Sequence, residues 1–138
     1  MATTVKKVTY CHIKVPSRAG QGAKALAALN DAGVELLMYS GFPIGGGKAQ
    51  LDFVPRSMTE FRRVARREGW RVSRNKKAFL IQGDDKPGAV SRLVNRLAAA
   101  GINATAGQAV AAGRKRFGMI LWVNPKAYRR AARALNAK

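Results

Sequence analysis

The strongest constraint on this chain is an internal repeat. Shifting the sequence against itself by 68 residues aligns Gly20 with Gly88 without a gap through the helix that follows each glycine. Further along, residues 61–66 match residues 128–133 at an offset of 67. A one-residue insertion or deletion in the hairpin between these stretches explains the changed offset. Because the repeat covers residues 7–135, one structural unit is expected to form twice.

Each copy has the same predicted order of elements: strand, helix, strand, strand, helix. In the second copy, a short apolar run at residues 78–82 is typical of a strand. The next helix is indicated by apolar residues at the i, i+3, i+4, i+7 spacing, namely Val90, Leu93, Val94 and Leu97. Residues 102–110 and 117–123 are the next two predicted strands, and Pro125 opens the last helix.

The two copies differ at their ends. The first copy finishes with one more predicted strand at residues 70–73, and the second has no segment left for one. The predicted fold class is therefore α+β, with two ferredoxin-like βαββαβ units in tandem, the second lacking its last strand. We place these units at residues 5–74 and 75–138, each with helices on one face of an antiparallel sheet. Because units of ~65 residues are near the lower limit for independent stability, we expect the two to pack together.

A turn in the second copy resembles a known motif. Residues 85–90 read Asp-Lys-Pro-Gly-Ala-Val, and residues 100–103 read Ala-Gly-Ile-Asn after the apolar helix. This pattern resembles the signature of ACT domains: a polar turn with Pro-Gly, an amphipathic helix, and a Gly-Ile-Asn entry to the second strand. The first copy is a degenerate version, with Ala19 where the motif has proline and Glu35 where it has asparagine. The resemblance implies a tandem ACT protein with no catalytic domain attached.

The resemblance also implies a ligand site. ACT domains generally bind small ligands, most often amino acids, at interfaces between units, and pass the occupancy to an enzyme or regulator. The matching positions here are Asp84, Asp85, Lys86, Pro87, Gly88, Ala89, Ile102 and Asn103. A glycine permits close backbone approach, and free N–H groups at a helix N-terminus suit a ligand carboxylate. The alternative is that Pro87 and Gly88 only form a tight turn and Asn103 caps a strand.

The first copy has an equivalent turn with different chemistry. Its positions are Ser17, Arg18, Ala19, Gly20 and Gln21, with Val34 and Glu35 at the next strand. We interpret Arg18 as a solvated loop residue, with pairing to a ligand carboxylate as the alternative. If one copy has lost its site, the sequence favours loss from this one.

Arrangements of residues typical of enzymes are missing from the sequence. Cys11 and His12 are neighbours on a predicted strand, so their side chains point to opposite faces and cannot form a nucleophile–base pair. Asp84 and Asp85 are adjacent carboxylates without a third nearby. The glycine runs lack the spacing of a phosphate-binding loop. We therefore predict a non-enzymatic protein with no catalytic residue, metal or cofactor.

The charge of the chain is extreme, with 26 Lys and Arg against 7 Asp and Glu, for a net charge of +19. Soluble domains of this size usually carry a net charge of ~2–8. Part of the excess is expected on the solvent faces of the two equivalent last helices, at Arg62, Arg63, Arg66, Arg67, Arg129, Arg130 and Arg133. These arginines predict an anionic partner, either nucleic acid or an acidic protein.

RNA binding is the alternative function. RNA-recognition motifs share the βαββαβ order, and residues 115–122 partly fit their third strand, with Phe79 placed where the first strand supplies a stacking ring. Arg116 stands where that motif has glycine, and Met119 replaces an aromatic residue. We therefore keep RNA binding as the second interpretation.

The sequence also gives expectations about the cellular location of the protein and about its assembly. A single cysteine, no signal peptide and no stretch of ~20 apolar residues predict a cytoplasmic protein that does not contact the membrane. The strand at residues 117–123 is apolar on both faces, with Ile120 and Trp122 on the side opposite Phe117. We expect a homodimer to cover that outer face.

Overall fold

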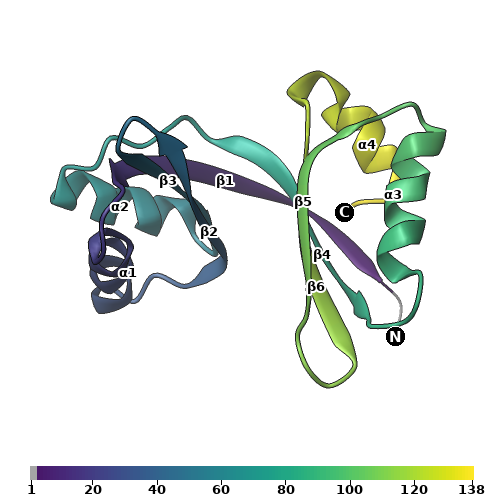
Figure 1. The fold of residues 1–138 in the computed structure, drawn as a ribbon, viewed down its shortest axis with the longest axis horizontal. Helices are drawn as coiled ribbons and strands as arrows, with labels where there is room; N and C mark the ends of the chain where they lie inside the picture. Colours follow the sequence, from purple (N-terminus) through teal and green to yellow (C-terminus); the bar gives the residue numbers. More distant parts are fainter. Residues whose placement is uncertain (1–2) are drawn as a thin grey trace. The chain divides into compact units, whose positions relative to one another are not determined.

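The computed structural model describes residues 3–138 and shows an α+β fold (Figure 1). Within these residues, six strands form an antiparallel sheet in the order β2-β3-β1-β4-β6-β5, accompanied by four α-helices. The contacts divide the chain into two units. The first unit is Thr9–Lys76, and the second combines the residues up to Val8 with Lys77–Lys138.

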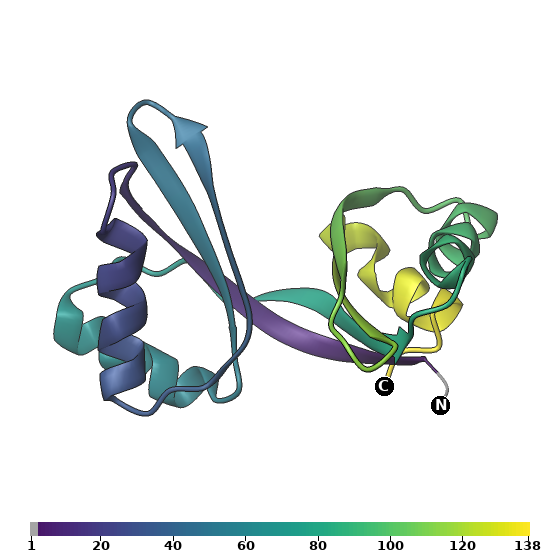
Figure 2. The same ribbon diagram turned by 60° about the horizontal axis from the view of Figure 1, so that its bottom comes forward.

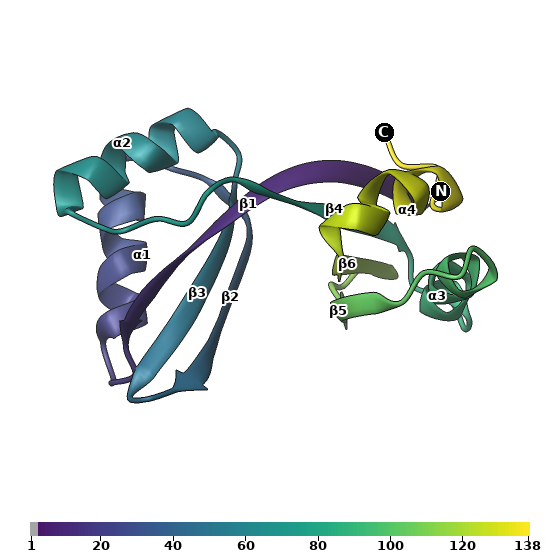
Figure 3. The ribbon, with the colours of Figure 1, turned by 90° about the horizontal axis from the view of Figure 1, so that it is seen from above.

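The first unit is built from three strands and two helices. Its elements are β1 (Thr4–Pro16), α1 (Gln21–Asp31), β2 (Leu36–Gly45), β3 (Lys48–Pro55) and α2 (Met58–Glu68). In the antiparallel pair of β1 and β3, Cys11 lies opposite Phe53 and Ile13 opposite Leu51. These four side chains are buried in one cluster with Phe61 of α2. Helices α1 and α2 cover the same face of the strands (Figures 2 and 3).

The second unit repeats this plan. Its elements are β4 (Lys76–Asp84), α3 (Ala89–Ala99), β5 (Ala104–Ala111), β6 (Arg116–Val123), a 3₁₀ turn η1 (Pro125–Ala127) and α4 (Tyr128–Ala134). Phe79 and Ile81 of β4 pack with Leu93 and Leu97 of α3 and with Tyr128 of α4. The helix is confirmed and its predicted apolar face is confirmed in part: Leu93 and Leu97 are buried and Val90 packs against the core, but Val94 is 42% exposed.

The repeat is visible in the backbone at matching positions. Gly20 and Gly88 are the N-caps of α1 and α3, and both adopt the left-handed conformation, with φ of 92° and 84°. Ser57 is the N-cap of α2, and its side chain accepts from the Glu60 N–H; at the matching place in the second unit, Asn124 caps the 3₁₀ turn η1 before α4, and its side chain accepts from the Lys126 N–H. A left-handed glycine thus begins the first helix of both units.

The predicted strand at residues 70–73 is not a strand in the structure, although this segment does run beside β1. The Ser73 N–H donates to the His12 carbonyl, while the His12 N–H donates to the Ser73 hydroxyl and not to its carbonyl. The Ser73 carbonyl instead accepts from the Arg62 guanidinium at 2.8 Å. The backbone pairing of this segment with β1 is therefore irregular at Ser73.

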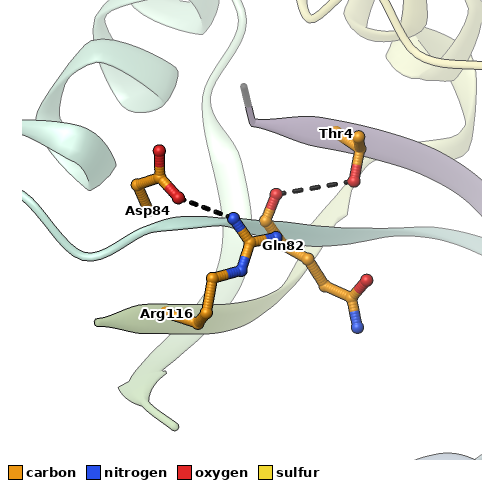
Figure 4. Close-up of polar contacts among 4 residues, drawn as sticks. All are labelled: Thr4, Gln82, Asp84 and Arg116. Atoms are coloured by element: carbon orange, nitrogen blue, oxygen red, sulfur yellow. Dashed lines mark hydrogen bonds and ion pairs between the residues drawn. The ribbon is translucent and has the colours of Figure 1, made fainter. Parts of the chain in front are cut away.

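The strand that the second unit lacks is supplied by the beginning of the chain. Strand β1 is the neighbour of β4 in the sheet, and Val5 is buried in the core of the second unit. The Thr4 hydroxyl donates to the Gln82 carbonyl at 3.5 Å (Figure 4). The Lys138 N–H donates to the Val5 carbonyl at 2.9 Å, so the chain's last described residue also lies along β1. Residues 5–8 therefore pack with the second unit, whereas the sequence placed them in the first.

The outer face of β6 is largely covered in the single chain. Ile120 is 5% exposed and Trp122 is half-buried. The homodimer expected at this face stays a prediction. Large apolar side chains are exposed instead on the edge strand β2, at Leu37, Tyr39, Phe42 and Ile44.

Tyr128 of α4 contacts strand β4 through its ring and its hydroxyl. Its ring stacks on Phe79 with centroids 4.5 Å apart, and its hydroxyl donates to the buried Ala78 carbonyl at 2.9 Å. Burial raises the pKa of this hydroxyl to about 12. We predict that Tyr128→Phe lowers the free energy of unfolding by about 1 kcal/mol, because the Ala78 carbonyl is left without its donor.

Urea denaturation measures this change, and Tyr39→Phe is the matched control. Tyr39 is 40% exposed and lies at the surface, so loss of its hydroxyl should change stability by less than ~0.5 kcal/mol. Equal effects of the two substitutions would show that the hydrogen bond to Ala78 does not stabilise the fold.

Candidate ligand-binding turns

The predicted site in the second unit is the turn between β4 and α3. Asp84 is the last residue of β4, and its carboxylate accepts a hydrogen bond from the Arg116 guanidinium of β6 at 2.8 Å (Figure 4). Residues 85–88 are exposed, and Ala89 begins α3 with its side chain in the core. The turn thus presents its backbone and polar groups outward, while Asp84 is held by its neighbour on the sheet.

Of the two predicted site residues after α3, one is buried and the other is exposed. Ile102 is 6% exposed and belongs to the core of the second unit, and its N–H donates to the Leu97 carbonyl at the helix end. Asn103 is exposed just before β5. Asn103 is therefore accessible to a ligand, whereas Ile102 contributes to packing.

The equivalent turn of the first unit borders a pocket of about 430 Å³. Its rim is the β1–α1 turn at residues 16–19 and the start of α1, and its walls come from β2 and β3. The apolar part of the lining includes Val15, Phe42 and Leu51. The sequence favoured the second copy as the one that keeps a site, but this pocket lies in the first.

The electrostatics of this pocket favour an anion. Arg18 contributes the one charged side chain of its lining, and Gln21 and Gly22 bring the first turn of α1 to the same place. The N-cap Gly20 has no side chain that accepts from this turn, in contrast to Ser57 at the start of α2. The Gln21 N–H donates to the Arg18 carbonyl at 3.3 Å, and the positive end of the α1 dipole lies at the rim of the pocket.

Two glycines make room for a tyrosine at this pocket. A Cβ atom on Gly22 would lie 3.0 Å from the Tyr39 hydroxyl, and one on Gly41 would lie 3.1 Å from the same oxygen. The phenol of Tyr39 therefore lies close to the backbones of Gly22 and Gly41, and a side chain at either position would crowd it. This places a hydroxyl group on the pocket wall.

The predicted arginine surface is divided in the structure. Arg62 is half-buried and donates to Ser73 and Asn75, so it is not on the solvent face where the sequence placed it. Arg130 donates to the Ala100 carbonyl at the end of α3. The remaining predicted members are exposed, at Arg63, Arg66, Arg67, Arg129 and Arg133.

The rings expected to stack on RNA bases are inside the second unit. Phe79 is 0% exposed and Phe117 is 4% exposed, and both pack against the helices. Met119, at the position of the second aromatic residue, is buried in the same cluster. The sheet therefore does not offer these side chains to bases, and the RNA interpretation rests on charge alone.

Cys11 is a core residue of β1, and His12 is a half-buried residue of the same strand. Burial raises the pKa of the Cys11 thiol to about 11, so it stays protonated at neutral pH. Burial and the neighbouring Lys76 ammonium lower the pKa of His12. Within residues 3–138, no three His, Cys, Asp or Glu side chains gather into a group suited to a metal ion.

Solved structures resemble the chain over nearly its whole length, although no protein-family model and no curated protein sequence matches it. Protein BT0572 from Bacteroides thetaiotaomicron matches with a TM-score of 0.79 and 13% identity, covering 97% of this chain and 88% of that one. The ligand-free regulatory subunit of aspartate kinase from Thermus thermophilus matches with a TM-score of 0.68 and 17% identity, covering 99% and 95%.

A putative C-terminal regulatory domain of aspartate kinase from Porphyromonas gingivalis W83 also matches, with a TM-score of 0.57, 15% identity, and coverage of 98% and 94%. Together these likenesses confirm the resemblance read from the sequence: the chain has the tandem ACT fold of aspartate kinase regulatory subunits. None of the helices described in residues 3–138 is long and apolar enough to cross a membrane.

Gly20, the left-handed N-cap of α1, shapes the β1–α1 turn beside the pocket. A Cβ on Gly20 would have no heavy atom within 4 Å, so Gly20→Ala tests the backbone conformation without a steric clash. Because L-residues pay ~1–2 kcal/mol in this region, we predict that Gly20→Ala destabilises the protein by that amount.

Gly118→Ala is the control, since Gly118 lies in β6 with no heavy atom within 4 Å of an added Cβ and no positive φ. We expect its effect to stay within ~0.5 kcal/mol in chemical denaturation. If the two variants unfold at the same denaturant concentration, the left-handed turn is not a constraint on the first unit.

Proposed function

We propose that the chain is a non-enzymatic regulatory protein of the ACT type that binds an amino acid or a similar small carboxylate. The observation that carries this proposal is the pocket at the β1–α1 turn, where an uncapped helix N-terminus meets Arg18 and an apolar wall. The fold supports the regulatory part, because the aspartate kinase structures that it resembles are regulatory subunits or domains.

The lining suggests how such a ligand lies. A carboxylate at the N-terminus of α1 accepts from the backbone N–H groups of its first turn and pairs with the Arg18 guanidinium. The ligand's side chain then lies against Val15, Phe42 and Leu51, which line the same pocket. No acidic side chain is among the lining residues, so an apolar side chain suits the pocket better than a basic one.

The β4–α3 turn is the second candidate for the same chemistry. Gly88 starts α3 in the left-handed conformation, again without a side-chain cap, and Asp85, Lys86, Pro87 and Asn103 are exposed around it. This turn has the closer match to the ACT signature, and the first turn has the pocket. Binding measurements on variants of each turn separate the two.

The partner and the assembly are part of the proposal. A regulatory unit acts by presenting its ligand-bound state to another protein, which we expect to be a cytoplasmic enzyme or regulator. A homodimer stays a prediction, and the exposed apolar residues of the edge strand β2 are the surface that favours it.

Calorimetry and thermal-shift measurements against the twenty amino acids test the ligand. We predict that small apolar amino acids, among them leucine and valine, raise the melting temperature, because a ligand that binds only the folded state stabilises it. Arg18→Gln should weaken the binding of that ligand about tenfold, because the charge-assisted bond to the carboxylate is lost.

Arg63→Gln is the matched control, because it removes an equal charge from an exposed position of α2. It should leave the affinity within twofold. Binding that responds to Asp85→Asn and not to Arg18→Gln would move the site to the second unit. If no amino acid shifts the melting temperature, the proposed function is contradicted.

A further inference from the structure

A second pocket, of about 550 Å³, lies in the second unit on the side of α4. Lys7 of β1 and Lys77 of β4 line it together with Arg129 and Arg133 of α4, and Asn136 completes its polar rim. The pocket draws on three separate parts of the sequence, and each contributes at least one cation. Its volume is within the ~300–1,000 Å³ typical of small-molecule sites.

The residues that line this pocket carry positive charge and no negative charge. Its lining contains no Asp or Glu, and none of the ion pairs described within residues 3–138 involves its lysines or arginines. Lys77 lies over the Tyr128 ring, with its Nζ atom 5.8 Å from the ring centroid. The Lys138 carbonyl oxygen accepts a hydrogen bond from the Lys7 N–H at 2.9 Å.

Four positively charged side chains therefore lie close together around this pocket. Arg129 and Arg133 are one helical turn apart, so both guanidinium groups extend from the same side of α4. Like charges gathered in a pocket repel each other and raise the local concentration of anions. A ligand with several negative charges relieves that repulsion, which a single carboxylate does only in part.

We propose that this pocket binds a small ligand that carries two or more linked phosphate groups. Planar guanidinium groups donate in pairs to phosphate oxygens, and the two lysines supply additional point charges. The Tyr128 ring does not offer a free face to a nucleobase, because it is buried and stacked on Phe79. Recognition is therefore of the phosphates, and a base or sugar attached to them extends toward solvent.

This site is independent of the amino acid pocket. The residues that form it belong to the second unit, whereas Arg18 and Val15 belong to the first. The two proposals can therefore fail separately. Two ligand classes on one chain would give a regulatory protein two inputs.

Isothermal titration calorimetry of the full chain with tripolyphosphate tests the proposal. We expect one binding site per chain, weakened about tenfold by the double substitution Arg129→Gln/Arg133→Gln. The control is Arg63→Gln/Arg66→Gln, which removes the same charge from exposed positions of α2 and should change the affinity less than twofold. Lys7→Gln is a second test variant at an exposed position, and circular dichroism establishes that each variant is folded.

Three results would overturn the proposal. Equal weakening by both double substitutions would mean that tripolyphosphate responds to the total charge and not to this pocket. Citrate binding as tightly as tripolyphosphate would show that phosphate is not the recognised group. Binding of a single-stranded RNA oligonucleotide, with no binding of tripolyphosphate at the same salt concentration, would assign the surface to nucleic acid.

Discussion

The structure depends on strand β1, which serves two hydrophobic cores. Val5, near its beginning, is buried with β4, β6 and α3, whereas Cys11 and Ile13, further along, are buried with β3, α1 and α2. A unit of ~65 residues without its fourth strand would leave one side of β4 without a hydrogen-bonded neighbour. By contributing its first residues to the second unit, β1 completes a sheet that the rest of residues 77–138 cannot complete.

The repeat gives the two units the same turn before their first helix, but the residues around these turns differ. Gly20 and Gly88 start equivalent helices in the same backbone conformation, and neither helix has a side-chain cap. In the first unit, Tyr39 and the apolar residues of β2 and β3 line an open pocket beside the turn. In the second unit, the concave surface lies beside α4 and is lined by cations. A duplicated fold thereby has two pockets whose linings differ in chemistry.

The sequence predicted the repeated helices and their starting glycines, because periodicity and turn residues are local signals. It did not predict that residues 5–8 join the second unit, since strand pairing between distant segments leaves no local pattern. Gly83 was the available hint: a Cβ there would lie 2.5 Å from the Thr3 hydroxyl oxygen, so the N-terminal segment requires this glycine. The sequence did not predict the pocket beside Arg18. Tyr39, Gly41 and Phe42 line it, and they are distant from the turn in the sequence and come next to it only in the folded chain.

Amide hydrogen exchange of a Val5→Asp variant, followed by NMR, tests the shared strand most directly. An unpaired carboxylate in the core of the second unit costs several kcal/mol, so the Leu121 amide of β6 should lose protection while the Leu51 amide of β3 keeps most of its own. Lys6→Asp, at an exposed neighbouring position, should leave both amides protected. Unchanged protection of Leu121 in the Val5→Asp variant would contradict the conclusion that the beginning of β1 completes the second unit.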